Sequence, residues 1–173
     1  MSRQMPSESA RMSSAAEARF RIDAPNSKRR AIKIIALDAP AERLVKRLAQ
    51  AKWNQASFFT ASAFAGAPAK GESFSMTGWL SDVAGRTKNL IDEVASADLV
   101  VMVATAGENA SAAAIIGEAA SATRINTTGL IIGAGASDEA LSKTLGQLRP
   151  WSLMLVIASA DDYIEDMLVA LRA

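Results

Sequence analysis

Asp98-Leu99-Val100-Val101-Met102-Val103-Ala104 opens the stretch of sequence that decides the fold, which runs from residue 98 to residue 171. Three short apolar runs in this stretch alternate with three segments whose apolar residues have helical spacing. The runs are 98–104, 128–132 and 153–158, and the helical segments are 110–123, 137–148 and 163–171. Because strands that are apolar on both faces belong to parallel sheets covered by helices, this alternation predicts three successive β-α units.

The same pattern extends toward the N-terminus. Residues 31–37 form another short, β-branched apolar run. Asp38-Ala39-Pro40 follows it and is typical of a helix start, so a helix is expected over 41–53. Further elements are expected at 57–64 (strand), at 72–80 (a strand within the glycine-containing irregular segment 65–85) and at 86–97 (helix).

Parallel strands joined by right-handed crossovers carry their helices on both faces of the sheet. The sequence therefore predicts an α/β fold of the Rossmann-like type, a three-layer, doubly wound, mainly parallel sheet with about six strands. Residues 1–30 are expected to form a flexible basic arm, and residues 31–173 a single domain.

Composition narrows the chemistry that the chain can perform. Half of the 173 residues are apolar, and there is neither cysteine nor histidine. Disulfides, thiolate nucleophiles, Ser-His-Asp triads, and zinc and haem ligands of the usual kind are thereby excluded. Acid–base work is left to carboxylates, lysine or tyrosine, and metal binding to oxygen ligands of the Mg²⁺ type. No metal site is predicted.

The charge distribution bears on partners. The net charge is +1, and residues 1–30 contain seven basic and three acidic side chains, a balance of +4 that leaves −3 for the rest. Specific nucleic-acid binding by the domain is therefore not expected. No apolar run approaches the ~20 residues that span a bilayer, so no membrane span is expected. The lack of an export signal predicts a cytoplasmic location.

The strand-to-helix loops of a parallel sheet emerge at one edge, where ligands bind in such folds. The polar and glycine residues of these loops are the candidate ligand-binding residues. They are Asp38, Gly107, Glu108, Asn109, Gly133, Gly135 and Asp161.

Gly133-Ala134-Gly135-Ala136-Ser137 follows a strand and opens a helix, the context in which backbone amides bind phosphate. Asp138 stands where the dinucleotide motif has its third Gly or Ala, and with Glu139 it adds negative charge to the helix start. A plain tight turn is the alternative interpretation.

Each carboxylate candidate also has a structural alternative. Asp38 either faces a ligand at the end of the first strand or caps the helix that begins near Pro40. Glu108 and Asn109 either contact a ribose, a sugar or a metal-bound water, or face solvent. Asp161 and Asp162 could hold Mg²⁺ or act as a base. Asp162, however, also forms a capping box with the glutamate three residues later.

Cationic and aromatic residues near the irregular segment are weaker candidates. Arg86 and Lys88 are expected at a helix start, where a cation needs an anionic partner such as a phosphate or Asp82. Trp79 is a candidate ligand cover, whereas Trp53 and Trp151 are expected in the core.

Residues 32–37 before a helix, together with a strand ending Thr105-Ala106-Gly107 before an Ala-rich helix, resemble the N-terminal nucleotide-binding half of the tubulin and FtsZ family. The resemblance covers roughly residues 31–135. In that family a strand ending Thr-Ala-Gly leads into a glycine-rich phosphate loop. Here Glu108-Asn109-Ala110-Ser111-Ala112 replaces those glycines, and Asp38-Ala39-Pro40-Ala41 replaces the glycines after the first strand.

Side chains and a carboxylate at these positions would crowd and repel a triphosphate. The family's second domain, which polymerisation and complete hydrolysis require, is not expected in this chain. The resemblance therefore implies a degenerate relative without GTPase activity, for which a nucleotide is the candidate ligand.

Three hypotheses of function follow. The favoured one is a non-catalytic ligand-binding or regulatory module that uses the sheet edge for a small molecule and its basic arm or helix faces for a protein partner. The second is an enzyme in which Asp38, Glu108 and Asp161 converge within about 6 Å and act with Mg²⁺ on a phosphorylated or nucleotide substrate. The third is a structural subunit of a homo- or hetero-oligomer, suggested by the many small residues of its helices.

Overall fold

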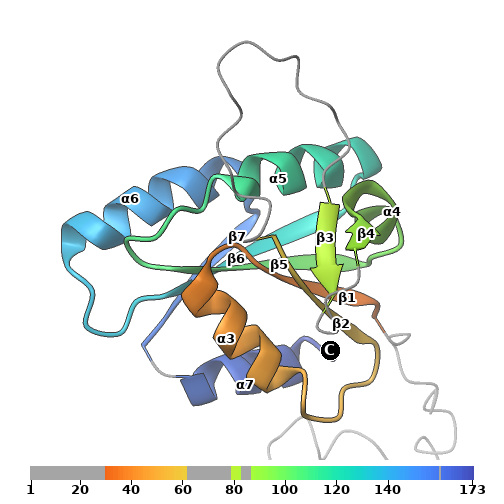
Figure 1. The fold of residues 1–173 in the computed structure, drawn as a ribbon, viewed down its shortest axis with the longest axis horizontal. Coiled ribbons are helices and arrows are strands. Elements are labelled where there is room, and N and C mark those ends of the chain that lie inside the picture. The colour runs from red at the N-terminus through yellow and green to blue at the C-terminus, as the bar shows by residue number, and fades with distance from the viewer. Residues whose placement is uncertain (1–29, 62–78, 83–86, 160) are drawn as a thin grey trace, which may run out of the picture.

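The computed structural model describes residues 30–61, 79–82, 87–159 and 161–173. In these residues one sheet has the strand order β4-β3-β2-β1-β5-β6-β7, with helices on both of its faces (Figure 1). Five neighbouring strands, β2-β1-β5-β6-β7, run parallel, and β3 and β4 are antiparallel additions next to β2. The prediction of a three-layer, mainly parallel Rossmann-like α/β fold is confirmed.

The elements alternate along the chain as the apolar runs predicted. The strands are β1 Ile32–Ala36, β2 Ala56–Thr60, β3 Trp79–Asp82, β4 Thr87–Asn89, β5 Leu99–Thr105, β6 Asn126–Ile132 and β7 Met154–Ala158. The helices are α3 Ala39–Leu48, α4 Leu90–Ala95, α5 Ala112–Thr123, α6 Asp138–Leu148 and α7 Asp161–Ala170, and the 3-10 turn η2 Arg149–Trp151 follows α6.

The strand order sets the place of a potential site. Taken in chain order, the five parallel strands lie 2-1-3-4-5 across the sheet, so the direction of winding reverses between β1 and β5. In open α/β sheets this switch point leaves a crevice at the carboxyl ends of the two strands, where ligands commonly bind.

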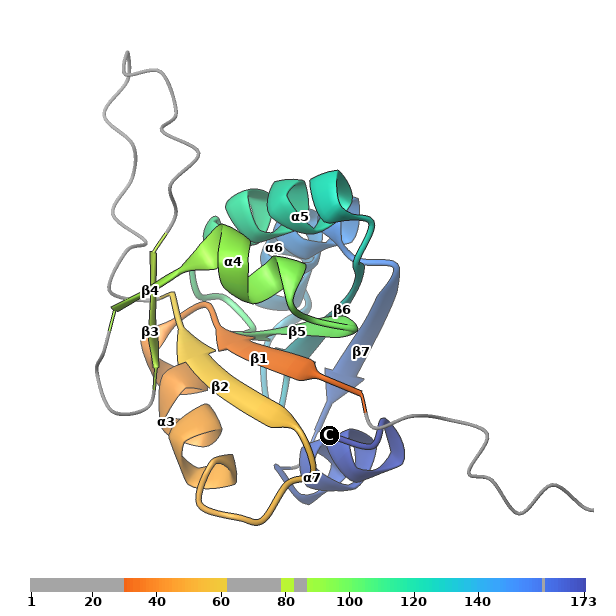
Figure 2. The ribbon, with the colours of Figure 1, turned by 90° about the vertical axis from the view of Figure 1, so that its right-hand side faces the viewer.

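Two apolar clusters hold the three layers together. One lies between the sheet and helices α4, α5 and α6, and the other lies between the opposite face and helices α3 and α7 (Figure 2). Central strands β1 and β5 supply fully buried side chains such as Ile35 and Met102 to the first cluster and Ile34 and Val101 to the second. Strands that are apolar in every position are thus explained by burial on both faces.

The first cluster includes one unusually close approach. Gly117 of α5 lies against Trp151 of η2, and a Cβ atom added at Gly117 would come within 2.6 Å of the Trp151 Cβ. The glycine lets the indole pack directly on the backbone of α5, so Trp151 is a packing residue as predicted.

Several predicted boundaries differ from the structure. The helix expected over 41–53 ends at Leu48, and the Trp53 Nε1 atom donates a hydrogen bond to the Leu48 carbonyl at 2.7 Å. The helix expected from residue 86 begins only at Leu90, with Asn89 as its cap, and Lys88 lies in strand β4 instead. The second correction places Lys88 in a strand, directly before the cap of α4 and not in the first turn of a helix.

Other predictions fall partly outside the described residues. These are the arm at 1–30 except Arg30, the end of the strand expected over 57–64, most of the strand expected over 72–80, and Arg86. No helix within the described ranges has the length and hydropathy that crossing a membrane requires.

Candidate functional site

The carboxyl ends of the parallel strands are aligned, which brings the predicted loops to one edge. Ala36 of β1 pairs with Thr60 and Val103, and Thr105 of β5 pairs with Ile132, which in turn pairs with Ala158. The loops that carry Asp38, Gly107 and Gly133 therefore leave the sheet at the same rim.

Asp38 lies in the switch point and is only 6% exposed. Its Oδ1 atom accepts hydrogen bonds from Ala41 N at 2.8 Å and Thr105 Oγ1 at 2.9 Å, and its Oδ2 atom accepts one from Thr105 N at 2.7 Å. The carboxylate thus caps α3 and also ties the end of β1 to the end of β5. We call this arrangement the Asp38 clamp.

The loop after β5 is bound to helix α6. Gly107, at φ +89°, donates its N–H to Thr144 Oγ1 at 2.9 Å and to the Ala140 carbonyl at 3.1 Å. Its carbonyl accepts from Lys143 Nζ at 3.2 Å, and the Ala110 N–H donates to Gln147 Oε1 at 2.8 Å. One face of α6 therefore takes up two amide N–H groups of the kind that a phosphate loop would offer to its ligand.

Glu108 and Asn109 are exposed at the tip of this loop. The Asn109 Oδ1 atom accepts from Ser111 N at 3.0 Å and from Gln147 Nε2 at 3.4 Å, so this side chain supports the loop. Glu108 is the acidic side chain that the loop presents to solvent.

The segment from Gly133 to Ser137 forms a tight turn. Gly133 N donates to the Ala158 carbonyl at 3.0 Å, Ala136 N donates to the Gly133 carbonyl at 3.1 Å, and Gly135 has φ +70°. The Ser137 side chain then caps α6 by accepting from Ala140 N at 3.2 Å. Asp138 and Glu139 stand in the first turn of α6, where their charge disfavours an anionic ligand.

Asp161 and Asp162 follow β7 at the same rim. Helix α7 begins at Asp161, so Asp162 lies inside the helix and not at the predicted cap position. The part of the chain with described side chains contains no group of three or more acidic residues that could hold a metal ion.

The sequence matches no protein-family model, and a search of curated proteins gave no match. The site is therefore interpreted from its own geometry.

Two small cavities are lined by residues that the structure describes. One, of about 60 Å³, lies between α4 and α5 and is lined mainly by Leu90, Ile91, Ile115 and Ala119. The other, of about 10 Å³, lies beside the end of β2, where the Thr60 Oγ1 atom donates to Glu42 Oε2 at 3.2 Å. Neither volume is near the several hundred Å³ that a drug-sized ligand occupies.

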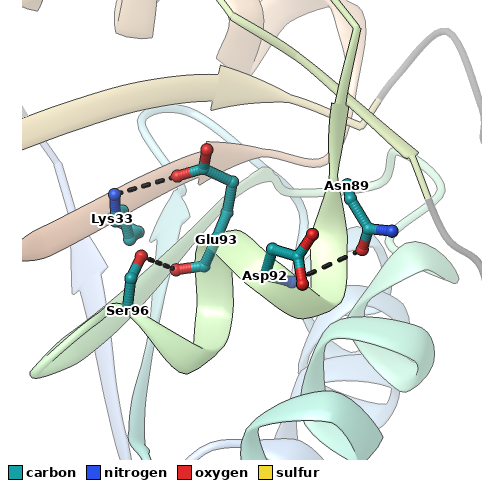
Figure 3. A network of polar contacts seen from close by, with 5 residues as sticks. All are labelled: Lys33, Asn89, Asp92, Glu93 and Ser96. Carbon is teal, nitrogen blue, oxygen red and sulfur yellow. Dashed lines mark hydrogen bonds and ion pairs between the residues drawn. The ribbon is translucent and has the colours of Figure 1, made fainter.

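The structure contains a largely buried ion pair, between Lys33 and Glu93, that was not predicted from the sequence. Lys33 of β1 projects toward α4, and its Nζ atom lies 2.9 Å from Glu93 Oε2 and 5.6 Å from the centre of the Phe59 ring (Figure 3). The side chains of Lys33 and Glu93 are 13% and 21% exposed. A lysine inside an apolar strand was the available signal, but its partner is 60 residues away in the sequence.

A second unanticipated feature is the exposure of β7. This strand was expected to be covered on both faces, yet Leu153, Met154 and Ile157 are 78%, 44% and 50% exposed. We call these three side chains the β7 surface; Leu153 directly precedes the strand, and Met154 and Ile157 lie on opposite faces of this sheet edge. The reason for the exposure is topological, because β7 is the last strand of the sheet and α6 and α7 cover only its inner side (Figure 2).

Proposed function

We propose that this chain is a non-catalytic interaction module that binds a protein partner through the β7 surface. The observation that carries the proposal is a contrast between two parts of the molecule. The Asp38 carboxylate and the amides of Thr105, Gly107 and Ala110 at the rim are hydrogen-bonded within the chain, whereas large apolar side chains are exposed at β7. Large apolar side chains exposed along one edge of a protein are typical of a protein interaction site.

The hydrogen bonds at the rim support the binding of a protein partner over the binding or conversion of a small molecule. A nucleotide at the switch point needs free amide donors and a crevice between the first and third parallel strands. Thr105 N is bound to Asp38, and Gly107 N and Ala110 N are bound to residues of α6. A phosphate would have to break these bonds and approach a buried carboxylate.

A carboxylate and Mg²⁺ enzyme has less support. Asp38 would have to act as a ligand or base, but three protein donors already surround its two oxygens. Glu108 is exposed at the loop tip, whereas Asp38 is buried beneath the loops.

We propose that the resemblance to the nucleotide-binding half of the tubulin and FtsZ family concerns the arrangement of strands and helices and not the activity. The Thr105-Ala106-Gly107 segment that carries the resemblance is engaged in the chain's own contacts, Thr105 with Asp38 and Gly107 with α6. This use of the segment supports a relative that keeps the layout without nucleotide hydrolysis.

A thermal-shift screen tests the non-catalytic part of the proposal. The purified chain is heated with nucleoside triphosphates and Mg²⁺, dinucleotides or sugar phosphates at millimolar concentration. We expect an unchanged transition temperature, because the described amides of Thr105, Gly107 and Ala110 at the rim are already bonded within the chain. A ligand present at 100 times its dissociation constant would add about 2.7 kcal/mol of stability. A reproducible rise of several degrees with any of these compounds would overturn the proposal.

A further inference from the structure

The two edges of the sheet differ in a way that points to a partner. Edge strand β4 is three residues long and polar, with Lys88 at its centre, which is a typical protection against pairing with another sheet. At the other edge, residues 153–158 contain no charge, proline or glycine. A long apolar edge of this kind pairs readily with another strand.

The backbone of β7 has hydrogen-bonding groups directed outward. The Ala158 carbonyl accepts from Gly133 N, directly after β6, and Ala158 pairs with Ile132 in the parallel register. Because alternate residues of a strand bond to the same neighbour, Met154, Val156 and Ala158 face β6 through their backbone groups. The N–H and C=O groups of Leu155 and Ile157 face the free edge.

We propose that the partner of the β7 surface is a second copy of this chain, bound by antiparallel pairing of the two β7 strands about a two-fold axis at Leu155. In this register Leu155 pairs with Leu155 of the second copy, and their outward backbone groups exchange two hydrogen bonds. Leu153, which directly precedes β7 and donates its N–H to the Thr127 carbonyl at 3.0 Å, then comes beside the end of the second β7 strand that carries Ile157. Leu153 and Ile157, the two most exposed side chains of the β7 surface, thereby approach each other at both sides of the axis.

The charges at the two ends of β7 suit this antiparallel arrangement. Exposed Arg149 precedes the strand, and Asp161 and Asp162 follow it. The two-fold axis at Leu155 brings the end that carries Arg149 beside the end of the second copy that carries Asp161, at both sides of the axis. A parallel arrangement would instead place like charges together.

The geometry also closes the assembly at two copies. Because both chains pair through the same edge, neither β7 strand stays available for a third chain. The edges left at the outside of the joined sheet are the polar β4 strands. This inference rests on the proposed function, since it names the partner of the same surface.

Analytical ultracentrifugation of the full chain at low and high micromolar concentration tests the inference. The expected result is a reversible monomer–dimer equilibrium with no larger species. Amide hydrogen exchange supplies a second measurement that needs no variant, because the Leu155 and Ile157 amides should be protected at high concentration and exchange faster on dilution. A strict monomer, or exchange at these amides that does not depend on concentration, would overturn the inference.

Charge substitutions test the register. Leu153→Lys alone and Ile157→Glu alone each place a charge against an apolar side chain, and each should raise the dimer dissociation constant at least tenfold. The double variant L153K/I157E sets opposite charges against each other across the axis and should restore dimerisation. Val169→Lys is the matched control, because Val169 is an exposed apolar residue of α7, 61% exposed and outside β7.

Dimerisation that survives both single variants, or that the double variant does not restore, contradicts the register. Loss of the dimer in V169K places the contact on α7 and contradicts it as well. The ligand screen is independent of these measurements. A monomer without ligand response overturns only the identity of the partner, whereas a dimer that responds to a nucleotide overturns only the proposed absence of a small-molecule function.

Discussion

At the scale of single residues, Asp38 determines what the switch point can do. A carboxylate at this position could have faced a ligand, and instead both of its oxygens accept hydrogen bonds from neighbouring segments. Hydrogen bonds to a charged group are stronger than those between neutral groups, and a buried donor that loses its partner is costly. The clamp is therefore a source of stability at the place where related folds hold their ligands.

Asp38→Ala should lower the free energy of unfolding by about 3 kcal/mol, because it removes the cap of α3 and leaves Thr105 N without its partner. Urea denaturation measures the change. Glu108→Gln at the exposed loop tip is the control and should shift stability by less than about 0.5 kcal/mol. If the stability losses of Thr105→Val and Asp38→Ala are additive in a double-mutant cycle, the two side chains do not interact and the Asp38 clamp is contradicted.

Lys33 and Glu93 should behave as a coupled pair (Figure 3). Glu93→Gln leaves a largely buried ammonium with a weaker partner and should cost about 2 kcal/mol of stability. The double variant K33M/E93L removes both charges and should recover most of that loss. Lys46→Met removes a half-exposed ammonium that pairs with Glu42 along α3; it is the control and should cost less than about 1 kcal/mol. Chemical denaturation of the wild type and the three variants measures these differences. A double variant with a lower free energy of unfolding than E93Q would contradict the coupling.

The sequence predicted single residues where the signal was local. Asp38 was expected at the end of the first strand, since an acid before Ala39-Pro40 is typical of a helix cap. Its second partner, Thr105, comes from a strand 67 residues away, and only the fold brings the two together. The Lys33–Glu93 pair was not anticipated for the same reason.

At the scale of elements, the contact between α5 and η2 depends on the absence of a side chain. Gly117→Ala should cost about 1–3 kcal/mol, because the added methyl group would overlap Trp151 and force the helix or the indole to move. The measurement is the midpoint of thermal or urea unfolding.

Gly146→Ala provides the matched helix control. A Cβ atom at Gly146 of α6 would meet no atom within 4 Å, so alanine there should stabilise the protein by roughly 0.5–1 kcal/mol through helix propensity. Equal effects of the two glycine substitutions would show that propensity alone matters, and that the Trp151 contact does not.

Element boundaries were predictable where composition changes sharply. The runs that became β5, β6 and β7 were found within two residues, because their residues are apolar or β-branched and turn signals flank them. Strand β4 was taken for the start of a helix, since Thr87-Lys88-Asn89 has no apolar alternation and forms only by pairing with β3. The early end of α3 coincides with a local hydrogen bond from the Trp53 side chain to the Leu48 carbonyl, which helix propensity does not anticipate.

At the scale of the whole molecule, the sheet has one protected edge and one open edge. If the open edge pairs with a second copy, unfolding is coupled to dissociation, and the thermal midpoint should rise with protein concentration. Calorimetry over a hundredfold range of protein concentration measures this dependence. The thermal midpoint of the Leu153→Lys variant should be the same at all concentrations. A wild-type midpoint independent of concentration would contradict the coupling.

The Asp38 clamp also bears on how the scaffold could acquire or lose a ligand through mutation. Its carboxylate sits among amide donors much as a bound anion would, so the chain carries its own occupant covalently attached. Replacing Asp38 with glycine would free those donors for phosphate but would first remove the bonds that join β1 to β5. A nucleotide-binding descendant would therefore need a compensating stabilising substitution beforehand. The effect of a change at Asp38 would thus depend on which mutations had come before it.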